Sequence, residues 1–254
     1  MRKTVALVDG RLVLVVRGDR TNRMRWVWLT PVAFFVLRVL GGQLVEEAVD
    51  QRDAPQAFAS KLLANAEVFT VGMYLVGLSG LAFLWFAWAL REKLRQHDTA
   101  GMAEAVAFGS AVVWGTLTVA AAVLAATAPV LADYFNDPEG ARLVTNLEFA
   151  AAPLALTLFG AFAVGNGLAL RRASLVPPWL AWTGAVLGCI LVVTAALQSI
   201  AEPTVSRSED EVHNIVSFLT GFTSFALVPL WTIAVGVALF RRDGRAPDDP
   251  DRQR

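Results

Sequence analysis

The sequence predicts an all-α polytopic membrane protein with six transmembrane helices and with both termini in the cytoplasm. Of its 254 residues, 56% are hydrophobic and 17% are charged, whereas a soluble domain usually has about 25% charged residues. The charges are clustered, and the apolar stretches between the clusters are long enough to cross a hydrocarbon core of about 30 Å. The basic residues also lie almost entirely in alternate loops.

The apolar stretches are continuous and do not alternate with period two, which indicates helices rather than the strands of a barrel. We predict transmembrane helices over residues 26–44, 67–90, 103–131, 147–170, 179–199 and 214–240. Together they define a transmembrane domain over residues 26–240. The polar, proline-containing tail of residues 241–254 is predicted to be disordered in the cytoplasm.

The distribution of lysine and arginine predicts the orientation of these helices. The predicted outer segments hold only Arg52, Lys61, Arg142 and Arg207, and all other basic residues except Arg38 lie in the inner segments. Tryptophans near the predicted cytoplasmic ends fit an interfacial belt, namely Trp26, Trp28, Trp85, Trp88, Trp179 and Trp182. We therefore expect a multi-pass protein of a bacterial plasma membrane.

Residues 1–25 are predicted to be a cytoplasmic N-terminal segment. Its sequence "TVALVDGRLVLVV" has two β-rich runs around Asp9 and Gly10, which is a hairpin signal. Met24 stands immediately before "RWVWLTP" and is a natural start for a membrane protein. The segment is therefore either a small hairpin or an upstream extension without a role.

The outer segments are predicted to be connections that are too short for a folded domain. Between the first two helices, Asp53 is expected to cap a short helix with Pro55 in its first turn. The segment "ADYFNDPEGARLVTN", residues 132–146, is acidic and rich in turn-forming residues.

One arginine, Arg38, lies inside a predicted transmembrane helix. It follows Trp26 by 12 residues, which places it about 18 Å into the membrane and in its outer half. A charge at the membrane centre costs roughly 2.5–3.5 kcal/mol on insertion scales. We therefore predict that Arg38 faces the bundle and pairs with a carboxylate, Glu67 or Glu148 before Glu46.

The sixth predicted helix carries polar residues at spacings of four, three and four, which places them on one helical face. With Arg38 they outline an outward-facing polar pocket, whose candidate ligand-binding residues are Arg38, Glu46, Glu67, Tyr74, Glu148, His213, Ser217, Thr220 and Ser224. The alternative is a structural network, because serine and threonine often hydrogen-bond between membrane helices.

A second hypothesis is a metal site formed by Glu67, Glu148 and His213, since carboxylate and imidazole groups suit zinc and other divalent ions. It lacks an HExxH motif, and we predict neither a metal nor a cofactor. No P-loop, GxSxG or dinucleotide fingerprint is present. We therefore assign no catalytic residue, and a net charge of zero gives no reason to expect nucleic acid binding.

Two small residues of the fifth predicted helix, Gly184 and Gly188, form a GxxxG motif, which predicts close approach of a partner helix. The single cysteine, Cys189, excludes an intramolecular disulfide and is expected to be a small packing residue.

The junction "RRASLVPPWLAWTGAVLG", residues 171–188, has a short basic loop followed by Pro-x-Trp-Leu-x-Trp-x-Gly. It resembles the junction of the fourth and fifth helices in uncharacterised bacterial six-helix integral membrane proteins of the "domain of unknown function" type. The resemblance implies a six-helix layout and a membrane location, and it transfers no site residues.

The predicted function is non-enzymatic. We expect a multi-pass membrane protein with an outward-facing polar pocket, either a small-solute carrier or an accessory membrane subunit. The alternative is a hydrolase-like intramembrane enzyme, metal-assisted or not, that uses the outer carboxylates and His213. The expected partners are the lipid bilayer and a helix packed on Gly184 and Gly188.

Overall fold

The structure is a computed structural model, and it describes residues 2–8, 11–17, 26–50, 53–97, 101–201 and 218–245. Near the N-terminus, β1 (Arg2–Val8) and β2 (Arg11–Arg17) pair as antiparallel strands, with Arg2 opposite Arg17 and Val8 opposite Arg11. Asp9 and Gly10, which carry the hairpin signal, lie outside the described residues.

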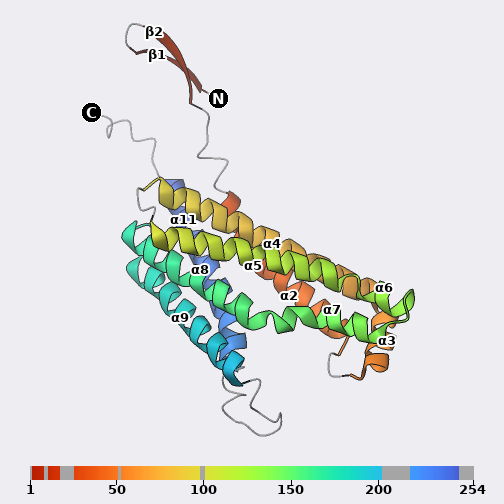
Figure 1. Cartoon of the computed structure of the whole chain (residues 1–254). Coiled ribbons are helices and arrows are strands. Elements are labelled where there is room, and N and C mark those ends of the chain that lie inside the picture. Colours follow the sequence, from red (N-terminus) through yellow and green to blue (C-terminus); the bar gives the residue numbers. More distant parts are fainter. Residues whose placement is uncertain are drawn as a thin grey trace.

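The rest of the described chain is built from helices (Figure 1). In chain order they are the 3₁₀ helix η1 (Trp26–Leu29), α2 (Thr30–Ala48), α3 (Pro55–Ala64), α4 (Ala66–Arg95), α5 (Met102–Ala125), α6 (Ala128–Asp133), α7 (Pro138–Ala150), α8 (Ala152–Arg172), α9 (Pro178–Ala201), the π-helix η2 (Thr223–Leu227) and α11 (Val228–Arg245). Residues 218–222 are also helical.

Six helical segments are long and apolar enough to cross a membrane, so the predicted six-helix membrane domain is confirmed. They span Val27–Ala48, Ala66–Arg95, Met102–Asp133, Pro138–Arg172, Pro178–Ser199 and Phe218–Arg242. Each overlaps one predicted helix. The predicted start of the sixth helix, residues 214–217, lies outside the described part of the chain.

The fourth segment begins nine residues earlier than predicted, and the interpretation of residues 138–146 as a turn-rich connection is wrong. A carboxylate oxygen of Asp137 accepts a hydrogen bond from the backbone N–H of Gly140 at 2.9 Å. This bond satisfies an N–H of the first turn of α7, while Pro138, the first helical residue, has no N–H to satisfy. The sequence thus starts a helix where its composition indicates a loop.

Two of the segments predicted to be outer connections contain helices, including the short helix expected near Pro55, and these helices form a helical cap on the bundle. Helices α3, α6 and α7 gather at one end of the bundle (Figure 1). They share a second apolar core with the ends of α2, α4 and α5, formed by Ala48, Val49, Phe58, Ala59, Leu62, Phe69, Met73, Ala125, Ala128, Ala132 and Ala141. The predicted capping role of Asp53 is wrong, because α3 begins after Ala54 and no side chain caps it.

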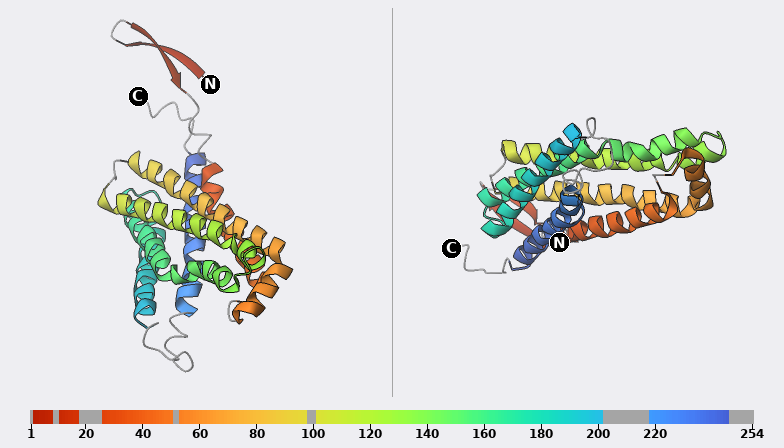
Figure 2. Two further views of the ribbon diagram at one scale, coloured as in Figure 1. Left: turned by 45° about the vertical axis from the view of Figure 1, so that its right-hand side comes forward. Right: turned by 90° about the horizontal axis from the view of Figure 1, so that it is seen from below.

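The transmembrane helices form a closed ring. Around this ring α2 packs against α4, α4 against α5, α5 against α8, and α8 against α9, and α11 packs against both α9 and α2. Figure 2 shows the last helix, in blue, between α2 and α9. A Cβ atom on Gly236 of α11 would lie 2.5 Å from the carbonyl oxygen of Trp28 in η1. The start of the first transmembrane segment therefore packs against the C-terminal half of the last one.

Glycines allow several of these helices to approach closely. A Cβ on Gly188 of α9 would lie 2.5 Å from the carbonyl oxygen of Gly160 in α8, and a Cβ on Gly184 would collide with the ring of Trp231 in α11. The predicted close helix approach at Gly184 and Gly188 is confirmed, and the contacting helices belong to the same chain.

Aromatic rings fill the centre of the ring of helices. The ring of Phe83 in α4 lies 5.2 Å from that of Phe34, 4.7 Å from that of Trp114 and 4.7 Å from that of Phe162. Phe159 of α8 stacks on Trp114 at 5.2 Å. We call these five residues, from α2, α4, α5 and α8, the aromatic plug. They are between 0% and 7% exposed, so they close the bundle at this level.

The tryptophans of the predicted belt differ in their surroundings. Trp85, Trp88, Trp179 and Trp182 are exposed on the outside of the bundle, as an interfacial belt requires. Trp28 is 1% exposed and packs edge-on against Phe86 at 6.4 Å. Its assignment to the belt is wrong, because its ring belongs to the core.

Candidate functional site

Arg38 is the transmembrane cation around which the candidate site is built. It lies on α2 four residues after Phe34, so the two side chains share one helical face. Phe34 belongs to the aromatic plug, and Arg38 therefore lies one helical turn beyond the plug, toward the helical cap. The side chain is half-buried, and its guanidinium carbon lies 5.8 Å from the centroid of the Phe225 ring. This is a cation–π contact between the first and last transmembrane helices.

Phe225 belongs to a π-helix, η2 (Thr223–Leu227), which interrupts the last transmembrane helix. The cause lies in the sequence, because Pro229 has no N–H to donate and its ring would clash with the carbonyl group of residue 225 in a regular α-helix. A π-helical turn separates these groups, and such turns occur frequently at functional sites. The sequence pattern alone did not predict it.

The π-helix alters the polar face predicted for the sixth helix. Thr220 is buried and Ser224 is half-buried, and the Ser224 hydroxyl donates to the carbonyl oxygen of Thr220 at 2.7 Å. Thr223, which the spacing did not select, is 3% exposed and lies on the inward side. The other two predicted members of this face, His213 and Ser217, lie outside the described residues.

The remaining candidate residues of helices one and two lie away from the bundle interior. Glu46, Glu67 and Tyr74 are exposed, with Tyr74 at 67%. Gly41 contacts Gly72, and the Asn65 side chain donates to the carbonyl oxygen of Ala48, so α2 and α4 run antiparallel.

This register places Arg38 level with residue 75, eight residues from Glu67. The separation along the axis is about 12 Å. Within α2 and α4 the structure therefore does not bring Arg38 to Glu67. Glu148 lies in α7 of the helical cap.

The metal hypothesis needs Glu67, Glu148 and His213 to converge. Among the residues that the structure describes, no group of three or more histidine, cysteine, aspartate or glutamate side chains is placed to hold a metal ion. Because His213 is not among them, the hypothesis stays untested.

An ion pair between a half-buried arginine and a buried glutamate, which the sequence did not predict, joins α4 to α5. Arg91 Nε donates to Glu104 Oε1 at 2.7 Å, and the guanidinium carbon of Arg91 lies 4.3 Å from the ring centroid of Phe108. Glu104 is 5% exposed, although it lies in the first turn of α5. The one signal in the sequence was an acidic residue shortly after the basic residues that end α4. This pair fixes the hairpin of the second and third spans.

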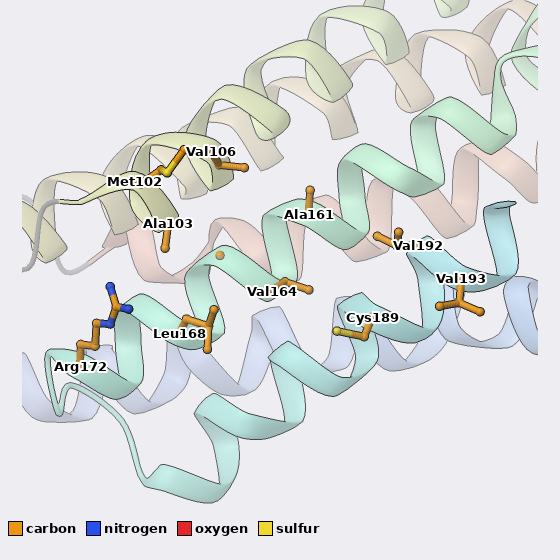
Figure 3. A pocket seen from close by; sticks show the side chains of 11 residues that line it. Met102, Ala103, Val106, Ala161, Val164, Leu168, Arg172, Cys189, Val192 and Val193 are labelled. Atoms are coloured by element: carbon orange, nitrogen blue, oxygen red, sulfur yellow. The ribbon is translucent and has the colours of Figure 1, made fainter.

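The structure also contains an apolar groove of about 640 Å³ on the outside of α5, α8 and α9 (Figure 3). It is lined by Met102, Ala103, Val106, Ala161, Val164, Gly165, Leu168, Arg172, Cys189, Val192 and Val193. Cys189 is exposed in this groove, so the expectation that it is a packing residue is wrong. The groove could not be predicted from the sequence, since its lining residues come from three helices.

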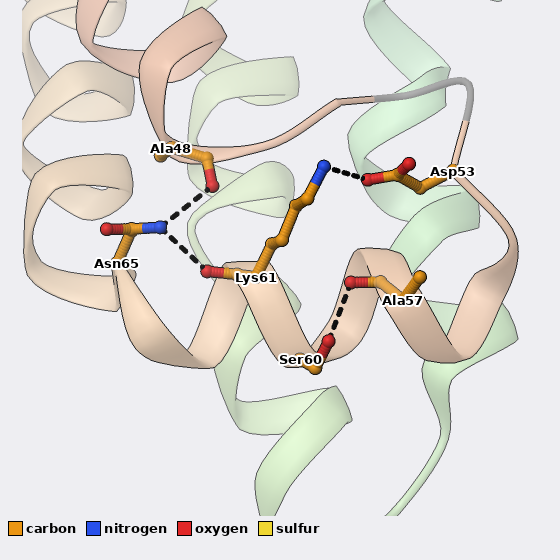
Figure 4. Close-up of polar contacts among 6 residues, drawn as sticks. All are labelled: Ala48, Asp53, Ala57, Ser60, Lys61 and Asn65. Atoms are coloured by element: carbon orange, nitrogen blue, oxygen red, sulfur yellow. Dashed lines mark hydrogen bonds and ion pairs between the residues drawn. The ribbon is translucent and has the colours of Figure 1, made fainter.

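Polar contacts order the connection between the first two spans (Figure 4). Lys61 Nζ lies 2.5 Å from Asp53 Oδ2, and this hydrogen bond raises the pKa of Lys61 above its ordinary value of 10.5. The side-chain amide of Asn65 donates to the carbonyl oxygens of Ala48 at 3.3 Å and of Lys61 at 3.1 Å. These contacts hold α3 against the end of α2.

A ring of six apolar helices with a charged residue inside one of them defines a polytopic membrane protein. Comparison with protein families agrees with this class. A family model described as "Domain of unknown function (DUF4386)" matches residues 29–240, and the chain belongs to that family. The resemblance seen at residues 171–188 is thereby confirmed. No curated protein and no solved structure matches the chain.

Proposed function

We propose that this protein is a non-enzymatic, multi-pass protein of a bacterial plasma membrane that binds a small anionic solute at Arg38 from the outer side. The observation that carries the proposal is the position of the Arg38 guanidinium, half-buried against the π-helix ring of Phe225 and one turn beyond the aromatic plug. A charged side chain at this depth in a membrane is costly, and such side chains usually have a functional role.

The chemistry of the site favours an anion. A guanidinium group is planar, is always charged at physiological pH, and binds carboxylate or phosphate oxygens in a bidentate manner. Buried Thr220 and Thr223 and half-buried Ser224 bring hydroxyl groups to the neighbouring stretch of the last transmembrane helix. Ser224 already donates to the backbone, so its oxygen keeps the capacity to accept a hydrogen bond.

The orientation in the proposal rests on charge. Helices α4 and α8 end in basic residues, Lys93 and Arg95 in the first case and Arg171 and Arg172 in the second. The end of the bundle with these residues is assigned to the cytoplasm by the positive-inside rule. The helical cap of α3, α6 and α7 is then outside, and Arg38 lies between the cap and the plug.

The aromatic plug supports the accessory subunit over the carrier. Its five rings pack within 4.7 to 6.4 Å of their neighbours, so they would have to repack before a polar solute could pass to the inner side. A binding or accessory subunit needs no such movement. The packing therefore favours a subunit that senses or presents the solute, and the enzyme alternative gains no support from the exposed Glu67.

The experiment is a thermal-shift measurement on the purified full chain in detergent, with inorganic phosphate, sulfate and succinate as probes. A ligand that binds the folded state raises the Tm with concentration. We expect at least one probe to raise the Tm of the wild type and of Arg95→Gln, an exposed matched control, and to leave Arg38→Gln unchanged. An equal shift in Arg38→Gln, or no shift by any probe, would overturn the proposal.

A further inference from the structure

We infer that the groove on α5, α8 and α9 binds one acyl chain of an anionic glycerophospholipid and that Arg172 holds the phosphate group. Residues of α8 (Ala161, Val164 and Leu168) form its floor, residues of α5 form the wall nearer to Arg172, and residues of α9 form the wall at the other end. Figure 3 shows these side chains along the groove, with Arg172 at one end. The occupant thus needs an apolar body and one negatively charged end.

The α8 floor of the groove matches one leaflet of a membrane in length, and Cys189, Val192 and Val193 of α9 continue the groove beyond Ala161. Ala161 and Arg172 are 11 residues apart on α8, which corresponds to about 16 Å. Half of a hydrocarbon core of about 30 Å is about 15 Å. A chain that begins beside Arg172 would therefore reach Ala161 near the middle of the bilayer.

The charged end lies where lipid phosphates lie. Arg172 is the last residue of α8, and Trp179 and Trp182, exposed on α9 at the same end, mark the membrane interface. Among the described residues that line the groove, Arg172 is the one with a charge. Its guanidinium group can bind two phosphate oxygens at once.

The neighbouring arginines contact other groups outside the groove, so Arg172 is the arginine placed to bind the phosphate. The guanidinium of Arg171 lies 5.9 Å from the ring centroid of Trp182, away from the groove. Arg242 Nη1 donates to the carbonyl oxygen of Ser174 at 2.7 Å. A helix of a second copy would cover the apolar walls, but it would bring no anion to Arg172, so charge complementarity favours the lipid.

The test is native mass spectrometry of the delipidated full chain, titrated with phosphatidylglycerol and with phosphatidylcholine of identical acyl chains. Both lipids carry a phosphate group, but the choline cation of phosphatidylcholine cancels its charge and is repelled by an arginine. The strength of one charged hydrogen bond corresponds to about a tenfold change in the dissociation constant. We expect phosphatidylglycerol to bind the wild type about tenfold more tightly than phosphatidylcholine, Arg172→Gln to lose this preference, and Arg171→Gln, the matched control, to keep it. Equal binding of both lipids, or equal loss in the two variants, would overturn the inference.

Two further arms separate the acyl chain from the phosphate group and the lipid from other occupants. Ala161→Phe should fill the groove and weaken binding of both lipids without lowering the Tm below that of Arg171→Gln. An anionic phospholipid with a diazirine at its chain end should cross-link to the floor or walls of the groove. If inorganic phosphate alone displaces the lipid, Arg172 belongs to a simple phosphate site. If the protein is a dimer and the dimers of Ala161→Phe dissociate when lipid is added, the groove is a protein interface. Either result would overturn the inference.

Discussion

Arg91 Nε donates to Glu104 Oε1 at 2.7 Å, so the last turns of α4 are tied to the first turn of α5. Glu104 is almost fully buried, whereas the Arg91 side chain is about one-third exposed. Glu104→Gln should therefore lower the free energy of unfolding by about 1.5–3 kcal/mol, the value of a charged hydrogen bond. Unfolding in mixed micelles measures this change, with the exposed Glu139→Gln as a control that stays near the wild type. The double variant Arg91→Met/Glu104→Leu should lose less than the two single changes added together.

Replacing Arg38 by leucine should destabilise the protein, although leucine partitions better into lipid. The reason is that Arg38 shares a helical face with Phe34 and makes a cation–π contact with Phe225, so about 1–2 kcal/mol should be lost. The Tm of Arg38→Leu in detergent checks this expectation. A stabilised variant would show that Arg38 faces lipid.

A double-mutant cycle should distinguish Glu67 from Glu148 as a partner of Arg38. Glu67 lies about 12 Å farther along the helix pair, so Arg38→Leu and Glu67→Gln should be additive within about 0.5 kcal/mol. Coupling with Glu148→Gln remains the prediction for an ion pair in this site. Strong coupling with Glu67 would require a different register of α2 and α4 from the one described.

Adding a methyl group to Gly188 should separate α8 from α9. A Cβ there would lie 2.5 Å from a backbone oxygen of Gly160, which cannot rotate away. Gly188→Ala should therefore cost about 1–3 kcal/mol, as overpacking typically does. Gly109→Ala is the matched control, because nothing lies within 4 Å of its added Cβ; it should be neutral or slightly stabilising, since alanine favours a helix. Equal Tm values for the two variants would contradict the close packing.

The Lys61–Asp53 contact gives a pH dependence with a defined sign. The hydrogen bond with Asp53 raises the pKa of Lys61 in the folded protein above 10.5. The contribution of this contact to the stability of the folded protein is therefore fully present below about pH 10.5 and is lost as the pH rises through the folded-state pKa of Lys61. The Tm difference between the wild type and Lys61→Met should shrink above this pH and stay constant between pH 7 and pH 9. A difference that grows with pH would contradict this linkage.

Cysteine labelling tests the proposed orientation. In a Cys189→Ala background, cysteines at Gln56 of α3 and Glu139 of α7, both exposed in the helical cap, should react with an impermeant thiol reagent added to intact cells. A cysteine at His97, in the opposite loop, should react only after the membrane is opened. Labelling of position 97 in intact cells would reverse the orientation.

The sequence predicted the parts of the fold that depend on composition along the chain. Apolar length identified all six spans, and the GxxxG motif identified a close helix contact at Gly188. Prediction from the sequence failed where local chemistry or contacts between different helices determine the structure. Asp137 and Pro138 started α7 inside a polar segment, and Pro229 required a π-helix that shifts the inward side toward Thr223.

The candidate site was predicted less well than the fold. The depth of Arg38 in the membrane could be predicted from the sequence, because it follows from the spacing between Trp26 and Arg38 in a helix. Its contact with Phe225 could not be predicted, since the two residues are 187 positions apart in the sequence (225 − 38). The groove and the Arg91–Glu104 pair likewise join residues from different helices, and no periodicity within one helix reveals such pairs.

The closure of the ring by α11 has a consequence for biogenesis. The last helix packs between α2 and α9, and Phe225 reaches Arg38 from it. A ribosome that adds roughly 5–20 residues per second needs on the order of ten to forty seconds to travel from residue 38 to residue 225. During this interval the nascent chain carries a membrane-embedded guanidinium whose aromatic neighbour has not yet been synthesised. We therefore expect the first helix to reach its final packing only when translation is almost complete.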